Sequence, residues 1–267
     1  MMLRGFIDES YSSENPPKMF ALTCTIANGS EWQWIEFAWL KCLEEKNASL
    51  VAQGRKPIRR YHSVSINNFV DDFEDWNGDE RTEFCKSLLK IFERHDWGYE
   101  GYLINLQELV DEWPETADDP LESAYDICVR FIMLEIGRQM KVELPEESIT
   151  LFFERCNYNK AIRDAFDSMI EDPTFAYKNC FTTIAPQGWE KCIPLQPADL
   201  VAYENFKEGY RELPPRPGER QRDQRLIFTH LISIESFVPH LKKMTRENIR
   251  ELRDIVNRAK LKKKHGS

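Results

Sequence analysis

Three acidic residues stand beside apolar runs that predict buried structure. Asp8 closes the strand-like stretch GFID, Glu154 closes LFFE, and Asp199 lies on the apolar face of LQPADLVAYENF. Asp and Glu are poor strand formers, and a charge taken out of water needs compensation. Clustered carboxylates would also repel one another and raise each other's pKa. A hard divalent cation resolves both problems, because Mg²⁺ takes oxygen ligands and keeps waters for substrate phosphates.

Each of these acids also has an ordinary interpretation. Asp8 could be a turn residue, because the stretch DESYSSENPP is rich in turn formers. Asp199 could be a first-turn acid that satisfies the dipole of a helix starting at Pro197. Glu154 could pair with a buried arginine. The residue types alone leave these alternatives open.

The elements that must position the acids are predicted from hydrophobic periodicity. Helices are expected at 30–50, capped by Ser30, and at 77–95, 118–141, 159–172, 194–213 and from about Thr245 onward. Strands are expected at 3–8, 19–28, 97–105, 148–156 and 179–186, the first two forming a hairpin-like pair. Strands interleaved with helices predict an α/β domain around a mixed sheet flanked by helices.

The chain has 267 residues, of which 42% are hydrophobic, so a sizeable core is expected. We expect one domain over 1–213, followed over 214–267 by an Arg/Pro-rich loop and a basic C-terminal helical appendage packed on it. No apolar run approaches the roughly 20 residues of a membrane helix, and no signal-peptide stretch is present. A soluble, cytoplasmic protein without a membrane partner is therefore expected.

The net charge of −9 is unevenly spread. Residues 71–80 carry six acids and no base, and we expect them on a solvated face. Residues 241–264 carry ten Lys and Arg against three acids, a local charge of +7. This asymmetry leaves a nucleic-acid partner open despite the acidic total.

Three motifs carry a resemblance to a known family. The stretches FIDES, YHSVS and LQPADLVAYE resemble the family called domain of unknown function thirty-eight hundred. That resemblance implies a ribonuclease H-like fold with helical insertions and a C-terminal helical extension. In that superfamily, acids on the first strand, a middle strand and a late helix bind Mg²⁺ or Mn²⁺ for nucleic-acid cleavage.

The resemblance gives roles to individual residues. It implies that Asp8, Glu154 and Asp199 are the metal ligands. Glu9 is expected to face the other side of the strand, and it becomes a ligand only if the strand ends at Asp8. His62 matches the histidine of the family and is expected to bind phosphate or move a proton.

Substrate contacts are expected from two further places. Gln196 is the companion of the late-helix acid in its motif. Arg220 and Arg222 flank the Pro-rich loop, and Arg forks suit phosphate oxygens, although a solvated loop is an equal alternative.

The sequence thus predicts a metal-dependent nuclease or phosphodiesterase that acts on DNA or RNA. The alternative is a non-catalytic nucleic-acid-binding or protein-interaction module of a larger system, such as phage defence, with a protein partner or a homo-oligomer. A nucleotide-processing hydrolase is a third interpretation, but the chain carries no GxxxxGK[ST] phosphate loop.

Overall fold

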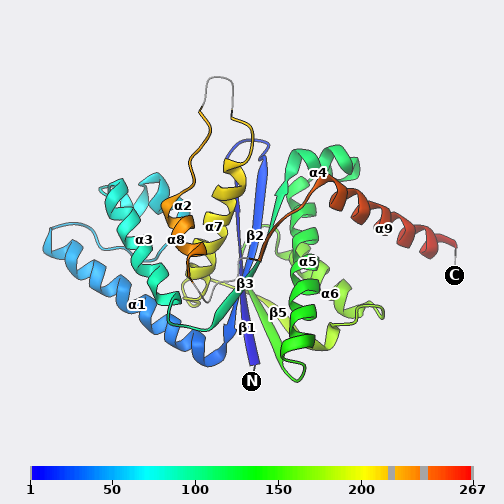
Figure 1. Cartoon of the computed structure of the whole chain (residues 1–267), viewed down its shortest axis with the longest axis horizontal. Helices are drawn as coiled ribbons and strands as arrows, with labels where there is room; N and C mark the ends of the chain where they lie inside the picture. Colours follow the sequence, from blue (N-terminus) through cyan, green and yellow to red (C-terminus); the bar gives the residue numbers. More distant parts are fainter. Residues whose placement is uncertain (1, 216–219, 235–239, 266–267) are drawn as a thin grey trace.

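The fold is α/β, built on a six-stranded mixed sheet with helices on both faces (Figure 1). The structure is a computed structural model that describes residues 2–215, 220–234 and 240–265. The strand order is β5-β4-β1-β2-β3-β6. The strands are β1 (Met2–Tyr11), β2 (Met19–Asn28), β3 (Trp97–Asn105), β4 (Ser148–Glu154), β5 (Phe181–Gln187) and β6 (His240–Lys243).

The connectivity divides the sheet into two parts. Strands β1, β2 and β3 form an antiparallel meander, because short connections suffice between antiparallel neighbours. Strand β4 pairs in parallel with β1, and β5 in parallel with β4, after crossovers that contain helices. Strand β6 adds in parallel to β3 at the opposite edge. The central strand β1 therefore lies between the two parts.

The helices cover the sheet in two layers, which Figure 1 shows on either side of the strands. One layer holds α1 (Gly29–Ala52), α2 (Ser63–Asn68), α3 (Gly78–Phe92), α7 (Leu195–Arg211) and α8 (Leu226–Ile232). The other holds α4 (Leu106–Glu112), α5 (Pro120–Glu143), α6 (Asn159–Glu171) and α9 (Arg246–His265). Short 3-10 turns occur at Asp71–Phe73, Pro114–Thr116 and Lys178–Cys180.

Each face of the sheet has its own apolar core. On the α1/α7 face, Phe6 packs edge-on against Trp32 and stacks on Phe152, with ring centroids 4.7 and 5.2 Å apart. On the α5 face, Ile7 belongs to a second core that is built largely on α5. Successive strand residues point to opposite faces, so β1 feeds both cores in alternation.

Most expected elements are present, and several details differ from expectation. Strand β1 continues to Tyr11 rather than ending at Asp8, because β2 stays paired with it along that length. Helix α1 is capped by Asn28, whose side chain accepts the N–H groups of Ser30 and Glu31; Ser30 lies inside the helix. The strand β6 and the short helices α2, α4 and α8 were not expected.

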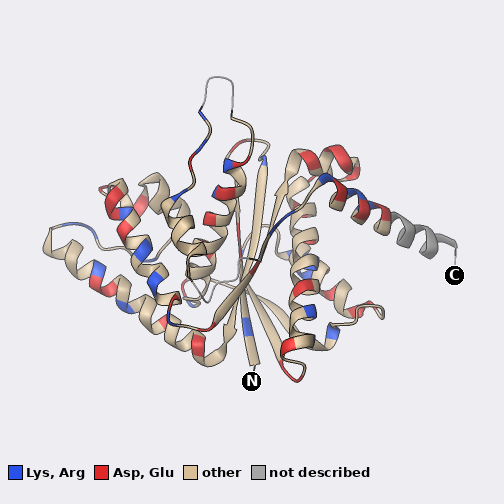
Figure 2. Cartoon of the chain, viewed as in Figure 1, with Lys and Arg blue, Asp and Glu red and all other residues tan. Residues whose placement is uncertain are grey.

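The C-terminal helix α9 packs against α4. Arg246 and Arg250 pair with Glu112, with Arg246 Nη1 3.0 Å from the Glu112 carboxylate. Figure 2 shows acidic residues gathered on α4, beside the start of α9. Within the described residues, no helix is long and apolar enough to cross a membrane.

Candidate functional site

The alternation of β1 sends its two acids to different faces. Asp8 shares the α1/α7 face with Phe6, while Glu9 shares the α5 face with Ile7. Asp8 is only 5% exposed and pairs across the sheet with Thr23 of β2. Asp8 is thus a buried strand residue and not a turn acid.

Strand β4 brings Glu154 level with Asp8. Phe6 pairs with Phe152 in parallel register, and two residues further on each strand come Asp8 and Glu154. The two-residue step keeps both acids on the face where the phenylalanines stack. Neighbouring strands lie about 4.8 Å apart, so the two carboxylates are lateral neighbours.

Helix α7 supplies the third carboxylate from above this face. The helix begins at Leu195 and packs on β1 and β2, so Asp199 lies past its first turn with its side chain toward the sheet. The Asp199 Oδ2 accepts the backbone N–H of Ser63 at 2.7 Å. Asp199 is therefore not a first-turn acid facing solvent, and the start of α2 holds its carboxylate in place.

The pKa shifts indicate that the three carboxylates converge. Burial raises the pKa of Asp8 well above its usual range, and the charges of Glu9, Asp199 and Glu154 raise it further. Burial also raises the pKa of Asp199 to about 7, which the Ser63 N–H opposes and the Glu154 charge reinforces. Mutual effects of this kind require short separations between the groups.

Arg60 forms an ion pair with one acid of this cluster. Its Nη1 lies 3.5 Å from Glu154 Oε1, and its guanidinium covers the Trp189 ring at 4.2 Å from the centroid. Burial raises the pKa of Glu154, and the Arg60 charge opposes that rise. The alternative in which Glu154 pairs with an arginine is thus present in the structure.

The carboxylate oxygens suit a hard cation, but the side chains are not arranged around one metal position. In the parts of the chain that are described, no three His, Cys, Asp or Glu side chains are arranged to hold a metal ion. Glu154 is directed to Arg60, and one Asp199 oxygen is bound to Ser63. Two buried carboxylates and a half-buried one, with a single arginine, remain the set of oxygen ligands that Mg²⁺ or Mn²⁺ prefers.

Glu9 lies outside this cluster, as expected for a strand that continues past Asp8. Burial raises the pKa of Glu9 to about 7, while the nearby Tyr125 hydroxyl of α5 opposes the rise. Glu9 nevertheless interacts with the cluster, because its charge raises the pKa of Asp8 and the Glu154 charge raises the pKa of Glu9.

Gln196 has a bridging position. Its Oε1 accepts the indole N–H of Trp39 at 3.1 Å and the backbone N–H of Tyr61 at 2.9 Å. The residue is buried. Gln196 therefore ties α1 and the 53–63 connection to α7, which fixes the height at which Asp199 meets the sheet.

His62 precedes α2 and lines a cavity of about 160 Å³ next to Arg60 and Trp189. Its Nδ1 lies 2.8 Å from Ser65 Oγ. Burial lowers the pKa of His62, and the Arg60 charge lowers it further, so the ring is neutral near pH 7. The cavity adjoins the acid cluster through Arg60, which also pairs with Glu154.

The two arginines of the Pro-rich loop lie at the far end of α7. Arg222 donates to the Tyr210 carbonyl at 3.2 Å and covers the Tyr210 ring, and Arg220 is exposed. Tyr210 follows Asp199 by eleven residues, which is about 16 Å along a helix. The structure does not bring Arg220 or Arg222 to the acid cluster. Residues 216–219 of that loop lie outside the described residues.

The acid-rich segment 71–80 was expected to be solvated, and this was partly wrong. Asp72 is buried and accepts the backbone N–H of Arg59 at 3.0 Å. Phe73 and Trp76, which alternate with the acids, anchor the segment in the core. The apolar residues within the run were the available signal. Sequence reasoning also missed Arg60, whose link to Glu154 spans 94 residues.

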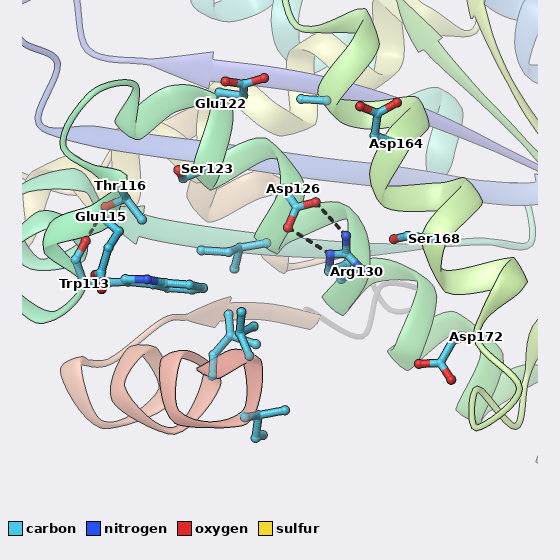
Figure 3. Close-up of a pocket in the computed structure, with 15 residues that line it drawn as sticks. Trp113, Glu115, Thr116, Glu122, Ser123, Asp126, Arg130, Asp164, Ser168 and Asp172 are labelled. Carbon is cyan, nitrogen blue, oxygen red and sulfur yellow. Dashed lines mark hydrogen bonds and ion pairs between the residues drawn. The ribbon is translucent and has the colours of Figure 1, made fainter. Parts of the chain in front are cut away.

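A larger cavity of about 750 Å³ lies on the other face, between α5, α6 and α9. Figure 3 shows Glu122 and Asp164 near its upper rim, with Asp126 paired to Arg130 inside. Leu252 and Ile255 of α9 contribute apolar surface. The cavity is on the side of the sheet away from Asp8 and Asp199.

No protein-family model matches the chain, and no curated protein matches it. The function is therefore inferred from the geometry of the site.

Proposed function

We propose that this protein is a divalent-metal-dependent phosphodiesterase that cleaves nucleic acid, built on a ribonuclease H-like domain of the family it resembles. The observation that carries this proposal is the convergence of Asp8, Glu154 and Asp199 from β1, β4 and α7 on one face of the sheet. These are the three positions at which the resemblance expects acids.

The connectivity of the sheet supports the fold part of the proposal. Three antiparallel strands are followed by two strands added in parallel on the other side of β1. This arrangement agrees with the ribonuclease H-like fold that the resemblance implies. The parallel pairing of β1 and β4 is what brings an acid on each strand to the same level.

The carboxylates of the cluster would hold Mg²⁺ or Mn²⁺ as oxygen ligands. Such an ion supplies Lewis acidity at the phosphate and lowers the pKa of water. Asp8 and Asp199 are fixed in place by β1 and by the Ser63 N–H. Glu154 would complete the set by exchanging the Arg60 guanidinium for the cation, which frees Arg60 for a phosphate oxygen.

Substrate would be held next to the cluster rather than at the Pro-rich loop. Arg59 and Arg60 line the cavity with His62, and Trp189 offers a ring on which Arg60 lies. Arginine and a half-buried aromatic ring suit a phosphodiester backbone with its bases. The net charge of −9 means that binding relies on these local cations.

The test is a cleavage assay with Mn²⁺ or Mg²⁺ on single-stranded and duplex DNA and RNA. The wild type should cleave one of these substrates, EDTA should stop it, and Asp199→Asn should abolish it. Asp167→Asn, an exposed acid on α6, serves as the matched control and should leave the rate unchanged. Cleavage that persists in Asp199→Asn would contradict the proposal.

A second candidate function is supported by the cavity in Figure 3. Acidic rims around an apolar floor suit a basic amphipathic helix of a protein partner. In that reading, the acid cluster is a structural feature and Glu154 keeps Arg60 permanently. A chain that binds no Mn²⁺ and cleaves none of the four nucleic acids would favour this interaction module.

A further inference from the structure

A chain of two hydrogen bonds links His62, Ser65 and Asp71, which line one cavity. The His62 Nδ1 lies 2.8 Å from Ser65 Oγ, one turn further along α2. The Ser65 hydroxyl lies 2.6 Å from Asp71 Oδ2 and donates to it. The residues lie within one segment, 62–71, that begins directly before the Ser63 N–H bound to Asp199.

The chemistry of these groups fixes the tautomer of the histidine. A carboxylate only accepts, so the single hydroxyl hydrogen of Ser65 is committed to Asp71. Ser65 Oγ must then accept from His62, and the proton of the neutral ring sits on Nδ1. This leaves Nε2 with its lone pair, and no hydrogen bond to Nε2 exists among the described residues. A fixed tautomer of this kind is what a proton acceptor requires.

The backbone holds the far end of this relay in an uncommon conformation. Asp71 has a φ of 59°, in the left-handed region that residues with a Cβ seldom adopt. The next residue, Asp72, is bound to Arg59, and the Val70 N–H closes onto the Ser65 carbonyl at 3.1 Å. Strain held by such anchors is typical of functional segments.

Burial, with the Arg60 charge adding to it, keeps the His62 ring neutral near pH 7, so its unprotonated nitrogen retains a lone pair. Arg60 opposes protonation of His62 and Asp71 favours it, while burial outweighs the latter and lowers the pKa. Arg59 and Asp72 line the same cavity, where they form an ion pair with each other.

We propose that Ser65 and Asp71 are positioning residues that present the Nε2 of His62 to the cavity as the proton acceptor of phosphodiester cleavage. This rests on the proposed function. In the step, the oxygen of a water molecule bonds to phosphorus while Nε2 takes one of its protons. The bond from phosphorus to the leaving oxygen breaks, and that oxygen takes a proton from solvent. The imidazolium then returns its proton to solvent.

The first test needs no activity. Nitrogen-15 NMR of the His62 ring in the full-length protein at neutral pH should show a protonated Nδ1 and an unprotonated Nε2. Ser65→Ala should give a mixture of both tautomers, and Ser65→Thr should restore the single form. Val64→Ala, an exposed neighbour on α2, is the control. A protonated Nε2 in the wild type, or no change in Ser65→Ala, would overturn the positioning role.

The second test measures cleavage with Mn²⁺. Ser65→Ala should lower kcat about tenfold with KM within about twofold, because general-base catalysis contributes about 100-fold or more and only its orientation is lost. Ser65→Thr should recover most of the rate, and an unchanged kcat in Ser65→Ala would overturn the proton-transfer role. A wild type without cleavage would overturn the proposed function and the proton-transfer role together, while the tautomer would still decide the positioning.

Discussion

The two faces of β1 treat two adjacent acids differently. Asp8 points to the α7 face, where Asp199 and Glu154 come close enough to raise its pKa. Glu9 points to the α5 face, where it meets the apolar core and the hydroxyl of Tyr125. Both carboxyls are shifted chiefly by burial, but only Asp8 has acids from two further elements on its own face.

This difference indicates that the number of carboxylates on a face decides how the cost of burying their charge is offset. Glu9, which has no other acid on its own face, is relieved by taking up a proton, since its pKa of about 7 permits it. Three acids with one arginine have more negative charge than Arg60 can balance. A divalent cation would neutralise the three acids together, and Glu9 would not be one of its ligands.

The largest expected effect is the difference in cleavage between substitutions on the two faces of β1. Asp8→Asn should lower Mn²⁺-dependent cleavage roughly 100-fold or more, because even the loss of a residue that only orients a ligand costs about 10–100-fold. Glu9→Gln should stay within about threefold of the wild type. Steady-state assays on the two variants make the comparison. Equal losses would show that the two faces do not differ in function.

Gln196→Ala tests whether α7 depends on its bridge. The substitution leaves the Trp39 indole N–H and the Tyr61 backbone N–H without their acceptor in the core. We expect a loss of about 2–3 kcal/mol in the free energy of unfolding, measured with urea. Gln107→Ala, an exposed glutamine on α4, is the control and should change stability by less than about 0.5 kcal/mol.

Stability in EDTA should fall as the pH rises from about 4 to 7. The pKa of Asp199 is raised to about 7, so the folded chain binds more protons than the unfolded chain across that window. Asp199→Asn and Glu9→Gln should each make the fall shallower, by about 1 kcal/mol or more at pH 7.5. Thermal unfolding over a pH series measures this.

Adding Mn²⁺ at pH 7.5 distinguishes the two faces by their effect on the melting temperature. The ion should raise the melting temperature of the wild type and of Glu9→Gln, because a ligand of the folded state stabilises it. It should leave Asp199→Asn unchanged. A stability that rises with pH in EDTA would contradict the assignment of the raised pKa values.

Arg60→Gln has the smallest expected effect. Arg60 competes with a cation for Glu154, and the pair is partly exposed, so its removal is worth on the order of 0.5–1 kcal/mol. We expect Mn²⁺ to bind about threefold more tightly, measured by calorimetry. Arg59→Gln, which lines the same cavity but pairs with Asp72, should leave the affinity unchanged. Weaker binding in Arg60→Gln would mean that Arg60 supports the cluster.

The periodicity of apolar residues predicted the principal strands and helices, because these elements depend on local sequence. The alternating and continuous apolar runs gave the five principal strands, and helical spacing placed Asp199 toward the sheet. Strand β6 was missed, because its four residues HLKK carry no apolar alternation. The cap of α1 was misplaced by two residues, since Asn28 and Ser30 are both good cap formers and tertiary packing decides between them.

The parts of the site that join distant segments could not be predicted. Arg60 reaches Glu154 through the packing of the 53–63 connection on the end of β4, and no local signal encodes that contact. The same holds for the Ser63 N–H that binds Asp199 across 136 residues. The hydrogen bonds from His62 through Ser65 to Asp71 lie within one short segment. They depend on the left-handed backbone of Asp71, which could not be predicted from the sequence.

The most direct test of the central claim is a calorimetric titration of Mn²⁺ into the wild type and into Asp199→Asn, with Glu9→Gln beside them. We predict binding to the wild type and to Glu9→Gln, and none to Asp199→Asn, which would establish the carboxylate site on the α7 face. No binding to the wild type, with and without carrier nucleic acid, would contradict the metal site and favour the interaction module.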